Sequence, residues 1–179
     1  MPYGPDLMDA LADDLVERGW SAHCISYRRV GEPGGGWPGT FDDVRAAVDG
    51  ADVVIGHSAG GHLALWAAGA VSTPPRLAVS LCGVVDLYAC YSQRLSRDAV
   101  VELLGGSPDD VPDRYAAASP RWCGVPTLLV HGADDDLVPV SMSVGWSEHA
   151  EVEVVEGEGH FECLDPSSRS WAKVVERLW

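Results

Sequence analysis

Apolar residues along the chain occur in two patterns, as short continuous runs and as stretches with helical spacing. Leu7, Leu11 and Leu15 recur at helical spacing in a stretch that begins at Pro5 and ends near Gly19, which predicts an amphipathic helix. Continuous apolar runs bounded by turn-forming or polar residues predict strands at residues 20–27, 51–55, 77–84, 125–130 and 152–155. Further helices are predicted at residues 41–48, 63–68, 141–149 and 168–178.

Strands that alternate with helices at this pace predict an α/β fold with a doubly wound, mostly parallel sheet. Such a sheet binds its ligands beyond the carboxyl ends of its strands. We expect one domain over residues 1–179. Residues 88–122 depart from the alternation because glycines and prolines break them into short helical pieces, and we expect this segment to form a lid-like excursion over one sheet edge.

Composition and charge exclude several classes of partner. Hydrophobic residues make up 46% and charged residues 22% of the chain, which is typical of a folded globular protein. The formal net charge of -15 repels phosphate backbones and anionic lipid, so we expect neither nucleic acid nor a membrane as a partner. The apolar runs also fall well short of the ~20 residues that span a bilayer. The oligomeric state stays open.

The five cysteines are odd in number and show no C-x-x-C spacing; they are Cys24, Cys82, Cys90, Cys123 and Cys163. With no basic-then-apolar leader before them, they favour reduced thiols in a cytoplasmic protein, each a small buried hydrophobic residue. The chain has no H-E-x-x-H motif and no calcium-binding loop, and its glycine run at 34–36 lacks the lysine of a P-loop. The sequence therefore predicts neither a metal site nor a cofactor.

The hexapeptide GHSAGG at residues 56–61 matches G-x-S-x-G between a predicted strand and a predicted helix. A serine in this context sits on a strained turn that needs small neighbours, here Gly56 and Gly60. The helix that follows directs its amide dipoles at developing negative charge. We therefore predict that Ser58 is a nucleophile and that the backbone amide of Ala59 is an oxyanion donor.

A nucleophilic serine needs a base, and the base needs an orienting acid. His160 follows the strand predicted at 152–155 after a glycine-bearing turn, and three aspartates, Asp134, Asp135 and Asp136, follow the strand at 125–130. The chain order serine, aspartate, histidine is that of α/β hydrolases. His160 is therefore the predicted general base. His57 and His131 are interpreted as packing or hydrogen-bonding residues.

Three motifs, GHSAGG, HGADDDLVP and GEGHFECLDP, together resemble the esterase and kynurenine-formamidase-like branch of the α/β hydrolases. The resemblance covers essentially the whole chain and implies that Asp135, the fifth residue of an HG-x-x-D-x-x-VP pattern, orients His160. Asp134 and Asp136 are interpreted as loop-capping or solvated carboxylates and stay alternatives. Asp86 is a further alternative, because some members of the family carry the acid after the preceding strand.

Members of that family also carry an H-G-G motif whose backbone amides supply part of the oxyanion hole, and this chain has none. The resemblance places the motif just before the helix at 5–18, and its strand between those at 20–27 and 51–55. Its absence would leave a gap in the sheet. We therefore expect Met1 to be a truncated or misassigned start and the native polypeptide to extend upstream through an H-G-G segment.

The sequence thus predicts a serine hydrolase that cleaves a small carboxylic ester or amide through an acyl-enzyme, with no cofactor. A small ester is the leading substrate class. An aryl formamide follows from the resemblance, and a peptide, cleaved by a prolyl-oligopeptidase (S9-like) enzyme, comes third. The alternative is a catalytically silent hydrolase-like module, or a fragment, that acts by binding if at all.

Overall fold

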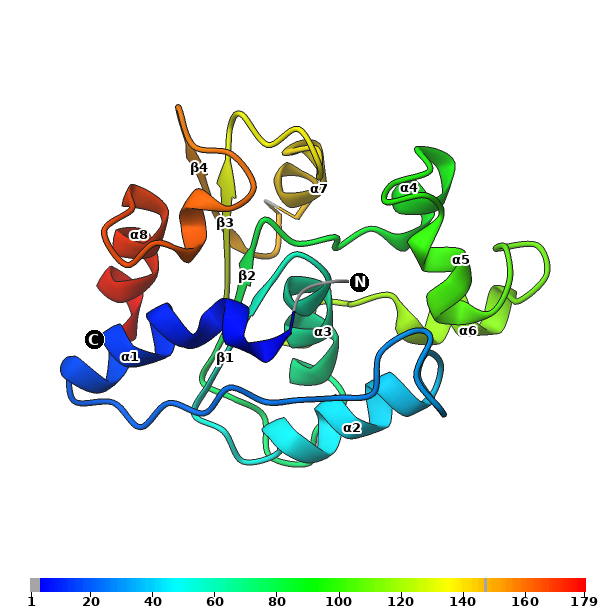
Figure 1. Ribbon diagram of the computed structural model, residues 1–179, viewed down its shortest axis with the longest axis horizontal. Coiled ribbons are helices and arrows are strands. Elements are labelled where there is room, and N and C mark those ends of the chain that lie inside the picture. Colours follow the sequence, from blue (N-terminus) through cyan, green and yellow to red (C-terminus); the bar gives the residue numbers. More distant parts are fainter. Residues whose placement is uncertain (1–3, 147) are drawn as a thin grey trace.

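The computed structural model describes residues 4–146 and 148–179, and a four-stranded sheet lies at its centre (Figure 1). The strands follow one another across the sheet in chain order, and each pair of neighbours is parallel. They are β1 (Val53–His57), β2 (Leu77–Leu81), β3 (Thr127–Gly132) and β4 (Glu151–Val155). The predicted α/β class with a parallel sheet is confirmed.

Helices connect and cover these strands, because parallel neighbours need crossover connections. In chain order they are η1 (Pro5–Met8), α1 (Asp9–Glu17), α2 (Gly39–Val48), α3 (Ala59–Ala68), α4 (Leu87–Ser92), α5 (Ala99–Leu104), α6 (Pro112–Ala118), α7 (Ser141–Val144), η2 (Glu162–Leu164) and α8 (Arg169–Leu178). The helix expected at 141–149 is shorter than predicted, ending before Gly145; residue 147 lies outside the described residues.

Two hydrophobic cores lie on opposite faces of the sheet, because successive strand residues point to opposite sides. Ala78 of β2 and Leu129 of β3 belong to the core that includes residues of α2 and α3. Their chain neighbours Val79 and Leu128 belong to the core under α1 and α8, which contains the fully buried Trp171. The sheet is therefore covered on both faces, as expected for a doubly wound fold.

The strand predicted at residues 20–27 is wrong, because this segment forms no ladder in the structure. A strand exists only by pairing, and among residues 4–146 and 148–179 the one strand beside β1 is β2. The apolar side chains of Ile25 and Tyr27, which suggested the strand, pack against the core instead. The sheet thus has no described strand on the outer side of β1. The expectation that Met1 is a truncated or misassigned start concerns a residue outside the described ones and stays a prediction.

Residues 88–122 form the short helical pieces predicted for them, with α4, α5 and α6 standing to one side of the sheet (Figure 1). Leu104 and Tyr115 are fully buried and tie these helices to the core that includes α2 and α3. The segment is therefore anchored by apolar contacts. Its role as a lid stays a prediction.

All five cysteines lie within the described residues and are free thiols. The interpretation as buried residues holds for Cys82, Cys90 and Cys163, whereas Cys24 is half-buried and Cys123 is exposed. Within residues 4–146 and 148–179, the structure contains no helix with the length and apolar character needed to cross a bilayer.

Backbone segments meet closely where β3 ends. A Cβ atom at Gly132 would lie 2.3 Å from the carbonyl oxygen of Glu158 and 2.4 Å from that of Gly159. The Asp134 N–H donates to the Glu158 carbonyl at 2.9 Å, and the Glu158 carboxylate accepts from the Arg169 N–H of α8 at 2.9 Å. The loop that carries His160 is therefore held against the end of β3, and only glycine fits at position 132.

We expect Gly132→Ala to lower the free energy of unfolding by about 1–3 kcal/mol, because backbone atoms must move to admit the methyl group. Gly60→Ala is the matched control, since a Cβ at Gly60 meets nothing within 4 Å. In α3 the control is expected to leave stability unchanged or raise it by up to about 1 kcal/mol. Urea unfolding of both variants measures the difference, and equal stabilities would contradict the close packing at Gly132.

Candidate functional site

Ser58 occupies the turn between β1 and α3 with a backbone φ of 55°, a left-handed conformation that is strained for a residue other than glycine. Its N–H donates to the Leu81 carbonyl at 2.8 Å, and its own carbonyl accepts from the Val84 N–H at 3.2 Å. A Cβ at Gly56 would lie 2.0 Å from the Gly60 carbonyl oxygen, so the predicted need for glycine holds there. The predicted need for glycine is wrong at Gly60, because a Cβ atom there would meet nothing within 4 Å.

The predicted oxyanion donor, Ala59, is the first residue of α3. The first N–H groups of a helix have no partner within the helix and lie at the positive end of its dipole. The Ala59 N–H is therefore placed to donate to negative charge that develops beside Ser58.

Asp135 and His160 form a buried hydrogen-bonded pair. The distance from His160 Nδ1 to Asp135 Oδ2 is 2.7 Å, and the two side chains are 5% and 0% exposed. Burial opposes ionisation of Asp135, but hydrogen bonds from the Val138 N–H, His160 and the Leu137 N–H outweigh it and hold the pKa of this carboxyl below its usual value. Asp135 is therefore a carboxylate at neutral pH. His160 donates its Nδ1–H to it, which leaves Nε2 as a proton acceptor.

His57 joins the turn of Ser58 to the loop of His160. Its Nε2–H donates to the His160 carbonyl at 2.8 Å, and the two rings lie 4.7 Å apart. Burial lowers the pKa of His57 to about 4, so it is neutral at neutral pH. The interpretation of His57 as a hydrogen-bonding residue is confirmed. Among the hydrogen bonds of the described residues there is none between the Ser58 hydroxyl and His160.

The alternative acids lie elsewhere. Asp86 caps α4, where its carboxylate accepts from the Ala89 N–H at 2.9 Å. Asp134 and Asp136 are exposed, and in the described part of the chain neither side chain forms a hydrogen bond with His160. Of the four candidate carboxylates, the geometry brings Asp135 alone against this histidine.

His131, which the sequence placed only as a packing or hydrogen-bonding residue, also contacts the acid. It is fully buried, and its Nε2 lies 3.1 Å from Asp135 Oδ2 and 2.9 Å from the Val138 carbonyl oxygen. Its Nδ1 lies 2.7 Å from the Ser143 hydroxyl. The sequence feature that could have indicated this contact is the HG-x-x-D pattern, in which His131 lies near the end of β3, four residues before Asp135.

Among the described residues, one group of side chains has donor atoms close enough together to suggest a metal site. It consists of Cys82, Asp135 and His160, whose donor atoms all lie within 4.8 Å of one another. The oxygen atoms of Asp135, however, already accept hydrogen bonds from Leu137, Val138 and His160. An ion would have to break the Asp135–His160 pair. We therefore do not assign these residues as metal ligands.

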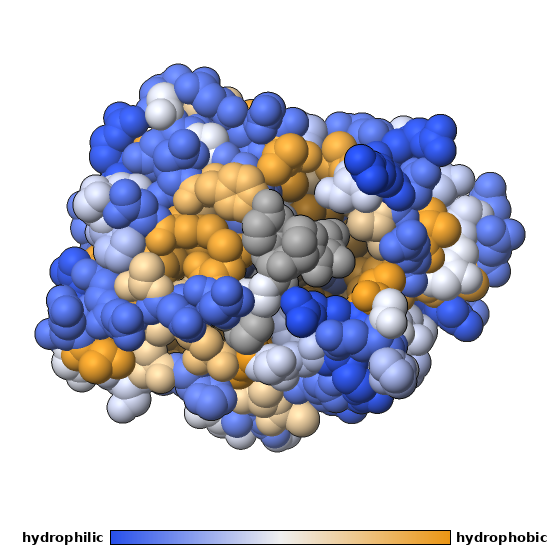
Figure 2. Space-filling view, viewed as in Figure 1, coloured by the Kyte–Doolittle hydropathy of each residue, from blue (hydrophilic) through white to orange (hydrophobic). Residues whose placement is uncertain are grey.

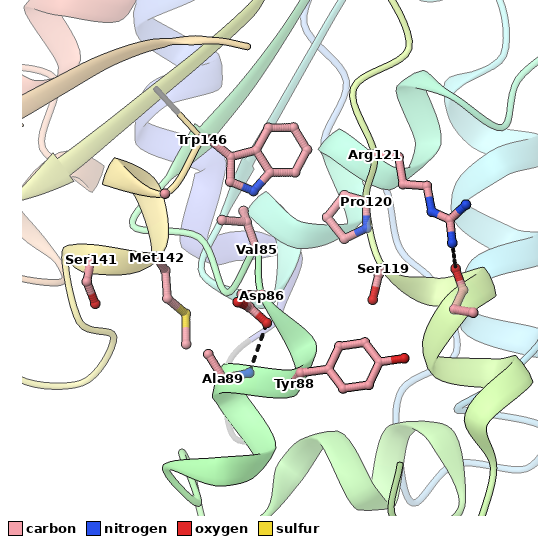
Figure 3. Close-up of a pocket in the computed structure, with 12 residues that line it drawn as sticks. Val85, Asp86, Tyr88, Ala89, Ser119, Pro120, Arg121, Ser141, Met142 and Trp146 are labelled. Carbon is pink, nitrogen blue, oxygen red and sulfur yellow. Dashed lines mark hydrogen bonds between the residues drawn. The ribbon is translucent and has the colours of Figure 1, made fainter. Parts of the chain in front are cut away.

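A cavity of about 510 Å³ lies between the segments that follow β2 and β3 (Figure 3). Its lining combines apolar side chains, among them Tyr88, Met142 and Trp146, with the polar side chains of Asp86, Ser119 and Arg121. Val85, another lining residue, directly follows Val84, whose N–H donates to the Ser58 carbonyl. The cavity is thus connected to the turn of Ser58 through Val84 and Val85, although Ser58, Asp135 and His160 do not line it.

The surface around these elements is mixed in character. Hydrophilic residues cover most of the periphery of the face in Figure 2, and apolar residues gather toward its middle. Tyr88 of the cavity is exposed, as are Leu137 and Phe161, which follow Asp135 and His160 closely in the chain. Apolar contact area is therefore available next to the candidate site.

Solved structures of hydrolases are similar to this chain. A bifunctional GH43-CE protein from Bacteroides eggerthii superposes with a TM-score of 0.76 at 20% identity, over 94% of this chain and 30% of that protein. An acetyl ester-xyloside bifunctional hydrolase from Caldicellulosiruptor lactoaceticus gives 0.62 at 22% identity, over 80% and 65%. A thermophilic esterase from Thermogutta terrifontis gives 0.63 at 18% identity, over 96% and 73%. At these identities the likeness shows a shared fold.

The chain spans less than two thirds of the first two of these proteins. A search of curated protein sequences finds no significant match. The model of the prolyl oligopeptidase family, whose members are serine hydrolases of the α/β-hydrolase superfamily, matches residues 47–166, which include Ser58, Asp135 and His160. The chain therefore belongs to the prolyl oligopeptidase family and has an α/β-hydrolase fold.

Proposed function

We propose that the chain cleaves a small carboxylic ester or amide through an acyl-enzyme, with Ser58, His160 and Asp135 as nucleophile, general base and acid. The observation that carries the proposal is the buried 2.7 Å hydrogen bond between Asp135 and His160. It fixes the imidazole so that its other nitrogen can accept a proton. Ser58 stands in its strained turn at the same edge of the sheet, joined to the His160 loop through His57.

In the proposed reaction, His160 Nε2 takes the proton from Ser58 Oγ as this oxygen attacks the substrate carbonyl carbon. The resulting oxyanion accepts a hydrogen bond from the Ala59 N–H. The imidazolium, stabilised by the Asp135 carboxylate, then gives its proton to the leaving alcohol or amine. Water attacks the acyl-enzyme with the same histidine as base, and Ser58 is released.

A small ester is the leading substrate class. The cavity of about 510 Å³, connected to the Ser58 turn through Val84 and Val85, offers Tyr88, Met142 and Trp146 for an apolar group of modest size. Several structures of similar fold are those of esterases. Membership in the prolyl oligopeptidase family supports a peptide as the second class. An aryl formamide stays a prediction, because no comparison bears on the kynurenine-formamidase-like branch, and so does a cytoplasmic location.

We expect a fluorophosphonate to form a one-to-one covalent adduct with the chain, detected by intact mass, because such reagents capture a serine that is activated by a base. The adduct is expected to disappear in Ser58→Ala. Ser141→Ala is the matched control, because Ser141 also lines the cavity but has no base beside it in the proposal. A folded wild-type chain that stays unlabelled would contradict the proposal and support the silent-module alternative.

We expect Asp135→Asn to slow fluorophosphonate labelling on the order of 10³–10⁴-fold, since an amide at this position no longer holds the productive tautomer of His160. Asp134→Asn and Asp136→Asn remove exposed carboxylates of the same loop, and Asp86→Asn removes the cap of α4. Labelling rates of these three variants are expected to stay within about threefold of wild type. A larger loss in any of them than in Asp135→Asn would assign the acid to that residue instead.

A further inference from the structure

We propose that His131 is a positioning residue for the acid: it shares its Nε2–H between the Val138 carbonyl and Oδ2 of Asp135, and so holds in place the oxygen that accepts from His160. The inference rests on the proposed function, because it concerns how Asp135 serves His160. Oδ2 of Asp135 lies 2.7 Å from His160 Nδ1 and 3.1 Å from His131 Nε2. One carboxylate oxygen thus lies between two imidazole rings.

The neighbours of His131 select its tautomer. Nε2 faces the Val138 carbonyl oxygen and the Asp135 carboxylate, and both groups can only accept a hydrogen bond. The hydrogen of a neutral ring must therefore be on Nε2. Nδ1 then accepts from the Ser143 hydroxyl at 2.7 Å, and this hydroxyl is itself fully buried. Every polar atom of the ring has a partner in this single arrangement.

The same arrangement saturates the carboxylate of Asp135. Oδ1 accepts from the N–H groups of Leu137 at 2.9 Å and Val138 at 2.8 Å. Oδ2 accepts from His160, and it lies 3.1 Å from His131 Nε2, whose N–H donates to the Val138 carbonyl. Val138 closes the network, because its N–H donates to the acid while its carbonyl accepts from His131. With these three donors and the His131 ring around it, the carboxylate cannot rotate away from His160 without losing hydrogen bonds.

Neutrality of His131 matters to this role. Burial lowers the pKa of His131, so at neutral pH it offers a hydrogen bond without a full positive charge. A charged ring at 3.1 Å would compete with the His160 imidazolium for the carboxylate. As a neutral donor, His131 spreads part of the negative charge of Asp135 and so moderates the attraction between the acid and the base.

Other titratable groups surround the dyad, and the test must keep them constant. They are His57 of β1, Cys82 after β2, Cys163 of η2, and Glu158 and Glu162 in the loop that carries His160. Glu158 and Glu162 accept backbone N–H groups of α8 and of Gly159 respectively, and the hydrogen bond with Cys82, together with burial, raises the pKa of Cys163. None of these residues is changed in the variants below.

The decisive experiment measures the rate of fluorophosphonate labelling against pH for wild type, His131→Phe and His131→Gln. Phenylalanine keeps the ring volume but removes the donor, so the full charge of Asp135 acts on the imidazolium. We expect the acidic limb of its profile to move up by about 0.5 to 1 pH unit. Glutamine places an N–H near the position of Nε2, and its profile is expected to return to that of wild type. An unmoved limb in folded His131→Phe would overturn the proposal.

A second measurement needs no activity, and it reads the tautomer in the wild-type chain. The ¹⁵N NMR signals of histidine side chains distinguish the two neutral tautomers, and His131→Gln identifies the signals of His131. The Nε2–H tautomer with Nδ1 accepting from Ser143 is the expected result, and an Nδ1–H tautomer at neutral pH would overturn the proposal. A wild-type chain that resists labelling but has the expected tautomer would contradict the proposed function alone.

Discussion

The buried hydrogen bond between Asp135 and His160 is the interaction that the candidate site depends on, and the parallel pairing of β3 with β4 makes it possible. Gly132 and Val155 are paired at the ends of these strands, so the loops after them start side by side. The N–H groups of Ala133 and Asp134 donate to the carbonyls of Val155 and Glu158. Two residues 25 positions apart in the chain thereby meet at 2.7 Å.

The same kind of contact recurs along the carboxyl edge of the sheet. The N–H of Ser58, just after β1, donates to the Leu81 carbonyl at the end of β2. The N–H of Cys82, just after β2, donates to the Val130 carbonyl of β3, and Ala133 repeats the pattern against β4. The first residue after each of β1, β2 and β3 is thus held by the next strand, which aligns the turn of Ser58 with the loops of Asp135 and His160.

The fold and the candidate residues could largely be predicted because their signals are local. Apolar runs marked β1 to β4, and G-x-S-x-G marked the turn whose strain the φ of Ser58 shows. The segment at 20–27 has the composition of a strand, but a strand also needs a second strand to pair with, and composition does not show whether one lies beside it. The contact of His131 with Asp135 depends on side-chain directions and on the approach of Ser143 from α7, so spacing alone could not reveal it.

A crystal structure of the chain after reaction with a fluorophosphonate would show whether the Asp135–His160 pair serves Ser58. We expect phosphorus bonded to Ser58 Oγ, a phosphonyl oxygen within hydrogen-bond distance of the Ala59 N–H, and His160 Nε2 facing the adduct while Nδ1 stays on Asp135. Phosphorus bonded to another residue, or His160 turned away from Ser58 with its bond to Asp135 broken, would contradict the account.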